Sequence, residues 1–367
     1  MSKLRKKFFS SLLALKRKRW GPPRKLSAFD PSSVRRILVV SCTAMGDTLL
    51  SVPAIRAVRQ NFPQAHLTWL ISPRFAPLFR PYLGGLVDQF LFYRGRYRGL
   101  WSLLRQFRMH QFQVALSFHD SDYVPVGLAY LSRVPFILRS ALKDAPFAPY
   151  LSERIPYRDE AHAVEQRLDV VRALLRSQGP FDPRLYLPVS EEQFAQAQVL
   201  LRQNVGSANP LIGFQCCASR PYREWPLDRF AALAEAIKER YPRAKIILFG
   251  SSKDRSRLES LRREGIVNLA GKIPLELLGA VLKSLALLVS VDTGPMHVAF
   301  AVNTPTVCLF VPSEVRHTGP YQDFHLHHVV LKPRPCQPCK RKYCPSPWCM
   351  ELIEVEEVLE KVIKVLG

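Results

Sequence analysis

Residues 34–61 read VRRILVVSCTAMGDTLLSVPAIRAVRQN, and this stretch decides the fold class of the amino-terminal half. Its first part, 34–41, is rich in Val, Ile and Leu, which indicates a short buried strand. A turn containing Gly46 follows, and residues 51–61 have the length and composition of a helix. A buried strand that leads directly into a helix is the unit from which parallel α/β sheets are built.

The same alternation continues along the chain and predicts a doubly wound, Rossmann-like domain over 34–189. Further strands are expected at 67–72, 89–93, 114–118 and 136–138, and further helices at 100–109 and 161–177. After a polar helix at 190–204 the alternation restarts, which predicts a second Rossmann-like domain over 190–350 and a C-terminal amphipathic helix within 351–367. Its strands are expected at 211–215, 245–250, 267–270, 287–292 and 306–311, and its helices at 228–240, 254–264, 274–284 and 295–301. Because ligands bind beyond the carboxyl ends of parallel strands, we expect the site in a cleft between the two domains.

Charge is distributed unevenly over the 367 residues, whose net charge is +23. Residues 1–25 contain ten Lys or Arg and no acidic residue. We interpret 1–33 as a basic amphipathic tail whose helix lies on an anionic membrane surface, and a disordered basic tail is the alternative. The helix would place its apolar residues on one side, namely Leu4, Phe8, Leu12 and Leu15.

No stretch has the roughly 18 uninterrupted apolar residues that a membrane-spanning helix needs. The apolar core of the basic segment is also too short for a signal peptide. We therefore expect a cytoplasmic protein, peripheral on the inner face of the cytoplasmic membrane.

The first candidate site residue is Asp47, which follows the first expected strand. Gly46 beside it permits close approach of the backbone. A carboxylate near the start of a helix can accept a proton from an attacking hydroxyl. The alternative is structural, since Asp is a common N-cap residue.

The second candidate is residues 290–297, SVDTGPMH, where a strand leads through a Gly turn into a helix. Free N–H groups at a helix start bind phosphate. Asp292 and Thr293 offer a carboxylate and a hydroxyl to a sugar or ribose beside Gly294. His297 either contacts a diphosphate or packs as a core histidine.

The third candidate is residues 219–226, SRPYREWP, which follow the first strand of the second half. Ser219 with Arg220 and Arg223 can neutralise a diphosphate leaving group. A solvated basic loop is the alternative.

These three segments, in this order, resemble glycosyltransferase family 9, the ADP-heptose:lipopolysaccharide heptosyltransferases. The resemblance covers about residues 34–366 and is strongest over 290–321, SVDTGPMHVAFAVNTPTVCLFVPSEVRHTGPY. MGDTLLSVPAIRAVR at 45–59 and REWPLDRF at 223–230 resemble two further family segments. The resemblance implies the GT-B architecture and an inverting transfer of heptose from ADP-heptose to a glycolipid, the lipopolysaccharide core acceptor.

The resemblance also implies roles for individual residues. Asp47 would be the general base, with Gly46 and His119 on the acceptor side. The donor would be bound by Ser219, Arg220, Arg223, Asp254, Lys272, Asp292, Thr293, Gly294 and His297. Arg223 stands where the family usually has Lys, and 216–218 read Cys-Cys-Ala where the family often has Gly or His. Residues 118–120 also depart from the family pattern, which leaves the acceptor open.

Two stretches of the sequence contain residues of the kind that bind metal ions. An Asp-x-Asp sequence at 120–122 is typical of metal-dependent transferases, but it lies in the half without the donor signature, so we expect catalysis without a cofactor. Four cysteines in the loop 335–350 have the ligand type of a structural zinc site. They are Cys336, Cys339, Cys344 and Cys349. An iron–sulfur cluster, two disulfides or free thiols are the alternatives.

Two rival functions are compatible with parts of the sequence. A GT-B transferase using another nucleotide sugar for cell-envelope glycans would keep the same fold. A nucleic-acid-binding protein would account for the charge, but it predicts basic residues interleaved with aromatics. Apart from 341–343 no such pattern occurs, so no nucleic-acid partner is expected.

Overall fold

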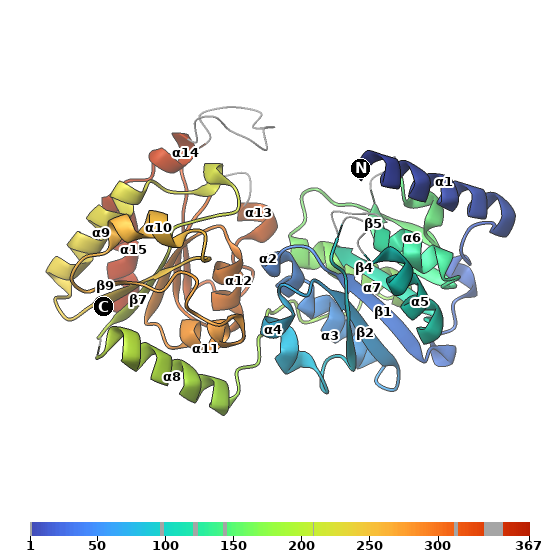
Figure 1. The fold of residues 1–367 in the computed structure, drawn as a ribbon, viewed down its shortest axis with the longest axis horizontal. Coiled ribbons are helices and arrows are strands. Elements are labelled where there is room, and N and C mark those ends of the chain that lie inside the picture. The colour runs from blue at the N-terminus through green and yellow to red at the C-terminus, as the bar shows by residue number, and fades with distance from the viewer. Residues whose placement is uncertain are drawn as a thin grey trace. The chain divides into compact units, whose positions relative to one another are not determined.

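The computed structural model describes residues 2–95, 99–119, 124–141, 145–207, 209–311, 315–333 and 348–367. The chain forms two compact units, Met1–Pro183 and Arg184–Gly367. Each unit contains one six-stranded sheet, and every strand pair is parallel (Figure 1).

The sheet of the first unit has the order β3-β2-β1-β4-β5-β6. Its strands are β1 (Arg36–Ser41), β2 (His66–Ile71), β3 (Gln89–Phe92), β4 (Val114–His119), β5 (Phe136–Ala141) and β6 (Glu153–Pro156). The central strand β1 is buried at every residue after the first, as its aliphatic sequence predicts. The chain changes direction across the sheet between β1 and β4, and this is the topological switch point.

The α-helices of the first unit lie before, between and after these strands. They are α1 (Ser2–Trp20), α2 (Met45–Leu49), α3 (Val52–Asn61), α4 (Ala76–Phe79), α5 (Leu100–His110), α6 (Val124–Leu131) and α7 (Ala163–Leu175). Helix α3 packs against α7, and α5 packs against α6.

The second unit repeats this topology with the order β12-β11-β10-β7-β8-β9. Its strands are β7 (Leu211–Gln215), β8 (Lys245–Phe249), β9 (Ile266–Asn268), β10 (Leu287–Val291), β11 (Thr306–Leu309) and β12 (His327–Val330). Its helices are α8 (Glu191–Val205), α9 (Leu227–Arg240), α10 (Arg255–Leu258), α11 (Leu278–Lys283), α12 (Gly294–Ala301), α13 (Val315–Thr318), α14 (Trp348–Glu351) and α15 (Val355–Leu366). The switch point of this sheet lies between β7 and β10.

Two strands were not predicted, and both lie at a sheet edge. Strand β6 has one buried residue among four, and β12 begins with two histidines. An edge strand pairs with a neighbour on one side only, so it can form with few apolar residues. Hydrophobic periodicity therefore does not predict such strands.

Helix α1 is packed on the first unit, so the alternative of a disordered tail is wrong for the part of α1 whose burial is described. Phe9 and Leu13 are each 1% exposed and belong to the core that includes α6. Gly127 of α6 makes room for them, because a Cβ there would lie 2.7 Å from the Phe9 ring. In Figure 1, α1 accordingly lies beside α6.

The predicted apolar side of α1 is not the side that packs on the protein. Phe8 and Leu15 are 62% and 64% exposed, and Leu12 is half-buried. Helix α1 therefore has two apolar stripes, one in the core and one at the surface. Among the described residues, no helix has the length and hydropathy required to span a membrane.

Candidate functional site

The candidate residues follow the strands at the switch point of each unit. In the first unit the chain passes from β1 to Asp47, while His119 is the last residue of β4. His119 is the register partner of Ser41, the last residue of β1. The Asp-x-Asp stretch, 120–122, lies outside the described residues.

Asp47 lies in the first turn of α2, where Gly46 is buried. The N-cap residue is Ala44, which makes no side-chain capping bond, so the N-cap interpretation of Asp47 is wrong. The Asp47 side chain is 31% exposed and its Oδ1 lies 3.5 Å from Nη2 of Arg167 on α7. The carboxylate is thus paired with a cation and still in reach of solvent.

Arg167 is a residue that the sequence analysis missed. Its side chain is 3% exposed, which is rare for a charged residue. Its position in α7 could have indicated that it is buried. Arg167 lies on the same helix face as Val164, Leu168 and Val171, all of which are buried.

In the second unit the structure brings three predicted residues together. Arg223 ends the 3-10 helix Pro221–Arg223, Asp292 follows β10, and His297 lies in α12. Nη1 of Arg223 lies 3.1 Å from Oδ2 of Asp292, and Nε2 of His297 lies 3.9 Å from its Oδ1. The Asp292 side chain is 3% exposed and that of Arg223 is 23% exposed.

The start of α12 lies in the same segment. Gly294 is the first residue of α12 and Thr293 is its N-cap residue, but the Thr293 side chain makes no capping bond. The buried Oγ1 of Thr293 has no hydrogen-bond partner among the described residues. Buried polar atoms are normally satisfied, so this hydroxyl and the first N–H groups of α12 suit an anionic ligand.

The loop that carries Arg223 is held by Glu224 and Trp225. The Glu224 carboxylate accepts from the Ala218 N–H at 2.9 Å and from Arg257 at 2.5 Å. Trp225 is fully buried and donates from Nε1 to the Ile353 carbonyl at 3.0 Å. On this loop Ser219 is exposed and Arg220 is half-buried.

Cys216 and Cys217 precede this loop and are buried. Burial raises the pKa of both thiols, that of Cys217 to about 12. Both are therefore neutral near pH 7 and are poor nucleophiles.

Asp254 and Lys272 lie on neighbouring loops after β8 and β9. Oδ2 of Asp254 accepts from the N–H of Ser251 at 2.8 Å and from its hydroxyl at 2.6 Å. The two loops touch at Gly271, where a Cβ would lie 2.6 Å from Cα of Ser252. Lys272 is exposed. Both residues thus lie beyond the carboxyl ends of strands, where a ligand of this sheet is expected.

Of the four predicted zinc ligands, Cys336, Cys339 and Cys344 lie outside the described residues. Cys349 belongs to α14 and is half-buried. In the part of the chain that the structure describes, no three His, Cys, Asp or Glu side chains form a metal-binding group.

Comparison with known proteins identifies the class. Residues 100–349 match the model of glycosyltransferase family 9 (heptosyltransferase). Lipopolysaccharide heptosyltransferase 1 of Pseudomonas aeruginosa is 27% identical over 84% of this chain and 87% of its own length. The structure of Escherichia coli ADP-heptose lipopolysaccharide heptosyltransferase II superposes with a TM-score of 0.74 at 22% identity, covering 90% of this chain and 98% of that one. That of Escherichia coli heptosyltransferase WaaC with ADP-2-deoxy-2-fluoro heptose gives 0.63 at 20% identity, covering 90% and 99%.

The two Rossmann-like units match the heptosyltransferase structures of the GT-B class, and the predicted fold class is confirmed. Within that class the chain belongs to glycosyltransferase family 9, and it is a glycosyltransferase enzyme.

Proposed function

We propose that the enzyme transfers heptose from ADP-heptose to a lipopolysaccharide core acceptor. The names of its relatives support this donor and acceptor. The observation that carries the proposal is the cluster of Arg223, Asp292 and His297 beside the start of α12, since a cation and the N–H groups of a helix start suit a diphosphate.

The proposed reaction is a single displacement. The Asp47 carboxylate accepts the proton of the acceptor hydroxyl while the hydroxyl oxygen attacks the anomeric carbon of heptose. The bond from that carbon to the ADP oxygen breaks, and ADP leaves with the electron pair. Arg223, Ser219 and the N–H groups near Gly294 stabilise the charge on the leaving diphosphate. One displacement inverts the configuration of the anomeric carbon.

A donor panel tests the substrate. The protein is incubated with ADP-heptose, other ADP-sugars and UDP-sugars, with and without a heptose-free lipopolysaccharide core, and nucleotide release is measured. We expect release of ADP from ADP-heptose that depends on the acceptor. Release only from a different nucleotide sugar would instead establish the rival envelope transferase.

Metal dependence is tested in the same assay. We expect transfer to persist in EDTA, because Arg223 and the helix start stabilise the diphosphate. Loss of activity that manganese restores would favour a metal role for the Asp-x-Asp stretch.

For residues 1–25 we propose an anionic membrane surface, rather than nucleic acid, as the partner, on the cytoplasmic side. The stripe of α1 opposite the core residues carries exposed Phe8 and Leu15 together with Lys18 and Arg19. A stripe of this kind suits a lipid interface. Vesicles with and without phosphatidylserine test this by co-sedimentation. Binding should require the anionic lipid and decrease in the double variant Phe8→Ser, Leu15→Ser, and unchanged binding of that variant would reject α1 as the contact.

For Cys336, Cys339, Cys344 and Cys349 we propose structural zinc. Elemental analysis of the purified protein should find one equivalent of zinc that is lost on Cys339→Ser. A finding of iron, or of no metal, would replace this proposal with one of the alternatives.

A further inference from the structure

Arg167 is a buried cation on α7 whose contacts converge on the segment that carries Asp47. Its Nη2 lies 3.5 Å from Oδ1 and 3.3 Å from the carbonyl oxygen of Asp47. Its Nε donates to Oγ of Ser51 at 2.9 Å, and Nη1 donates to the Ala163 carbonyl at 2.6 Å. Each of the three guanidinium nitrogens of Arg167 therefore has a hydrogen-bond partner.

Ser51 links Arg167 to Asp47 a second time. The Ser51 hydroxyl donates to the Asp47 carbonyl at 3.1 Å and lies 2.9 Å from the hydroxyl of Ser41. A hydroxyl has one hydrogen to donate and two lone pairs that accept. Because the Ser51 hydroxyl donates its hydrogen bond to the Asp47 carbonyl, its lone pairs accept from Arg167 and from Ser41. Ser41 is the last residue of β1, and the Asp47 backbone is thus fixed to the end of the central strand.

The charge of Arg167 requires a partner, because a buried cation without one is costly. Burial lowers the pKa of Arg167 and the negative charge of Asp47 raises it. A guanidinium nevertheless stays protonated in proteins. Among the described residues, the titratable group of Tyr157, which follows β6, also acts on this charge.

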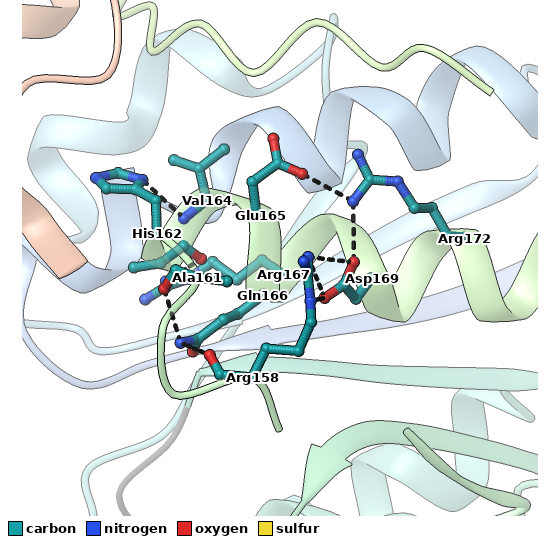
Figure 2. A network of polar contacts seen from close by, with 10 residues as sticks. Arg158, Ala161, His162, Val164, Glu165, Gln166, Arg167, Asp169 and Arg172 are labelled. Carbon is teal, nitrogen blue, oxygen red and sulfur yellow. Dashed lines mark hydrogen bonds and ion pairs between the residues drawn. The ribbon is translucent and has the colours of Figure 1, made fainter. Parts of the chain in front are cut away.

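Hydrogen bonds and ion pairs stabilise helix α7 around Arg167, as Figure 2 shows. Arg158 forms two bonds to the Asp169 carboxylate, and Arg172 bridges Asp169 and Glu165 at 2.9 and 2.8 Å. Nδ1 of His162 accepts from the N–H of Val164 at the start of the helix. These contacts lie on α7 and the segment before it, and none of them involves α2.

We propose that Arg167 is the positioning residue for the catalytic base: it holds the Asp47 carboxylate ionised and in one orientation. The proposal rests on the proposed role of Asp47. Arg167 itself gives up no proton. When Asp47 accepts the proton of the acceptor hydroxyl it becomes neutral, and Arg167 keeps its bonds to Ser51, to Ala163 and to the Asp47 carbonyl. The backbone of the base therefore stays in place during the reaction.

The test compares Arg167→Gln and Arg167→Lys by the pH profile of kcat/KM. Loss of the positive charge makes ionisation of Asp47 harder, so in Arg167→Gln the acid limb should move up by about one pH unit. Its kcat should fall about 10- to 100-fold, because misplacing a reactive group by about 1 Å can cost about 100-fold in rate. Arg167→Lys keeps the charge without the planar fork, so its acid limb should stay near that of the parent while kcat recovers in part.

Arg172→Gln is the matched control, because Arg172 lies on the same helix and, among the carboxylates that the structure describes, contacts Glu165 and Asp169. It should leave the acid limb unchanged. ADP affinity and circular dichroism show whether each variant is folded. If Arg167→Gln folds poorly, the pH profile of Arg167→Lys tests the proposal instead. This variant keeps the positive charge, so a displaced acid limb in it would overturn the proposal.

Asp47→Asn separates the two proposals. If it retains transfer, Asp47 is not the base and the proposed reaction fails. If it is inactive while a folded Arg167→Gln keeps the parent pH profile, only the role of Arg167 is overturned.

Discussion

The two switch points carry the same kind of ion pair with opposite burial. In the first unit the cation is buried and the anion reaches solvent, since Arg167 is 3% and Asp47 is 31% exposed. In the second unit the anion is buried and the cation is more accessible, since Asp292 is 3% and Arg223 is 23% exposed. The two sheets have the same strand order. At one switch point a partly exposed carboxylate is paired with a buried cation, and at the other a partly exposed guanidinium is paired with a buried anion.

This difference supports the proposed division of the reaction between the two units. A carboxylate that reaches solvent suits proton transfer from an acceptor, and a guanidinium that reaches solvent suits a diphosphate. In each case the buried partner pairs with the group that is proposed to meet the substrate.

Asp47→Asn removes the accessible anion and keeps the shape of the side chain. We expect kcat to fall about 1,000-fold, within the range for loss of a general base, while ADP affinity is unchanged. Steady-state kinetics and calorimetric titration with ADP measure the two effects. Asp30→Asn, on an exposed Asp that caps the 3-10 helix Pro31–Ser33, is the control and should have parent activity.

Acid should weaken the second unit more than the first through His327. Burial lowers the pKa of His327 to about 4, with Asp323 opposing and His325 and His328 adding to the shift. Between about pH 6.5 and 4 the unfolded chain binds a proton that the folded chain does not. Stability present above pH 6.5 is therefore lost as the pH falls towards 4, by about 3 kcal/mol at most.

Hydrogen exchange resolved by unit, at pH 7 and pH 4.5, measures this loss. In His327→Gln the second unit should lose less stability on acidification. An equal loss in parent and variant would assign the acid sensitivity to other groups.

Arg223→Ala removes the accessible cation of the second unit. ADP affinity should fall about 30-fold, or about 2 kcal/mol, because a charge-assisted bond to phosphate is lost. Arg223→Lys should recover most of the affinity. Arg263→Ala is the control, since Arg263 of the same unit precedes β9, pairs with Glu235 and should leave ADP binding unchanged. An Arg223→Ala variant with parent affinity would remove this residue from the donor site.

Gly127→Ala should have the smallest effect and should be confined to the first unit. The added methyl group would press on Phe9 and Leu13, so α1 must shift, and overpacking of this kind costs about 1 kcal/mol. Hydrogen exchange should increase in α1 and α6 and stay the same in the second unit. Faster exchange in the second unit would mean that the two units are coupled.

Much of the fold follows from sequence pattern, because buried parallel strands are continuous apolar runs separated by helices. Strand β7 lies at the residues predicted, and β1 and β10 differ by two residues or fewer at each end. The pairing of Arg223 with Asp292 was not predicted, since it depends on how two loops meet across the switch point. Arg167 was missed for the same reason. It is 120 residues from Asp47, and only the packing of α7 brings them together.

Helix α1 also depends on residues far along the chain. The Tyr130 hydroxyl donates to the Gly21 carbonyl just after α1, and Arg17 of α1 donates to the Pro149 carbonyl. These partners lie 109 and 132 positions later, and α6 consists entirely of buried residues that α1 helps to cover. During synthesis α1 therefore leaves the ribosome long before its binding surface exists. Docking of α1 is then a late step in folding of the nascent chain. Until α1 docks, the side chains of Phe9 and Leu13 are exposed and can be bound by chaperones.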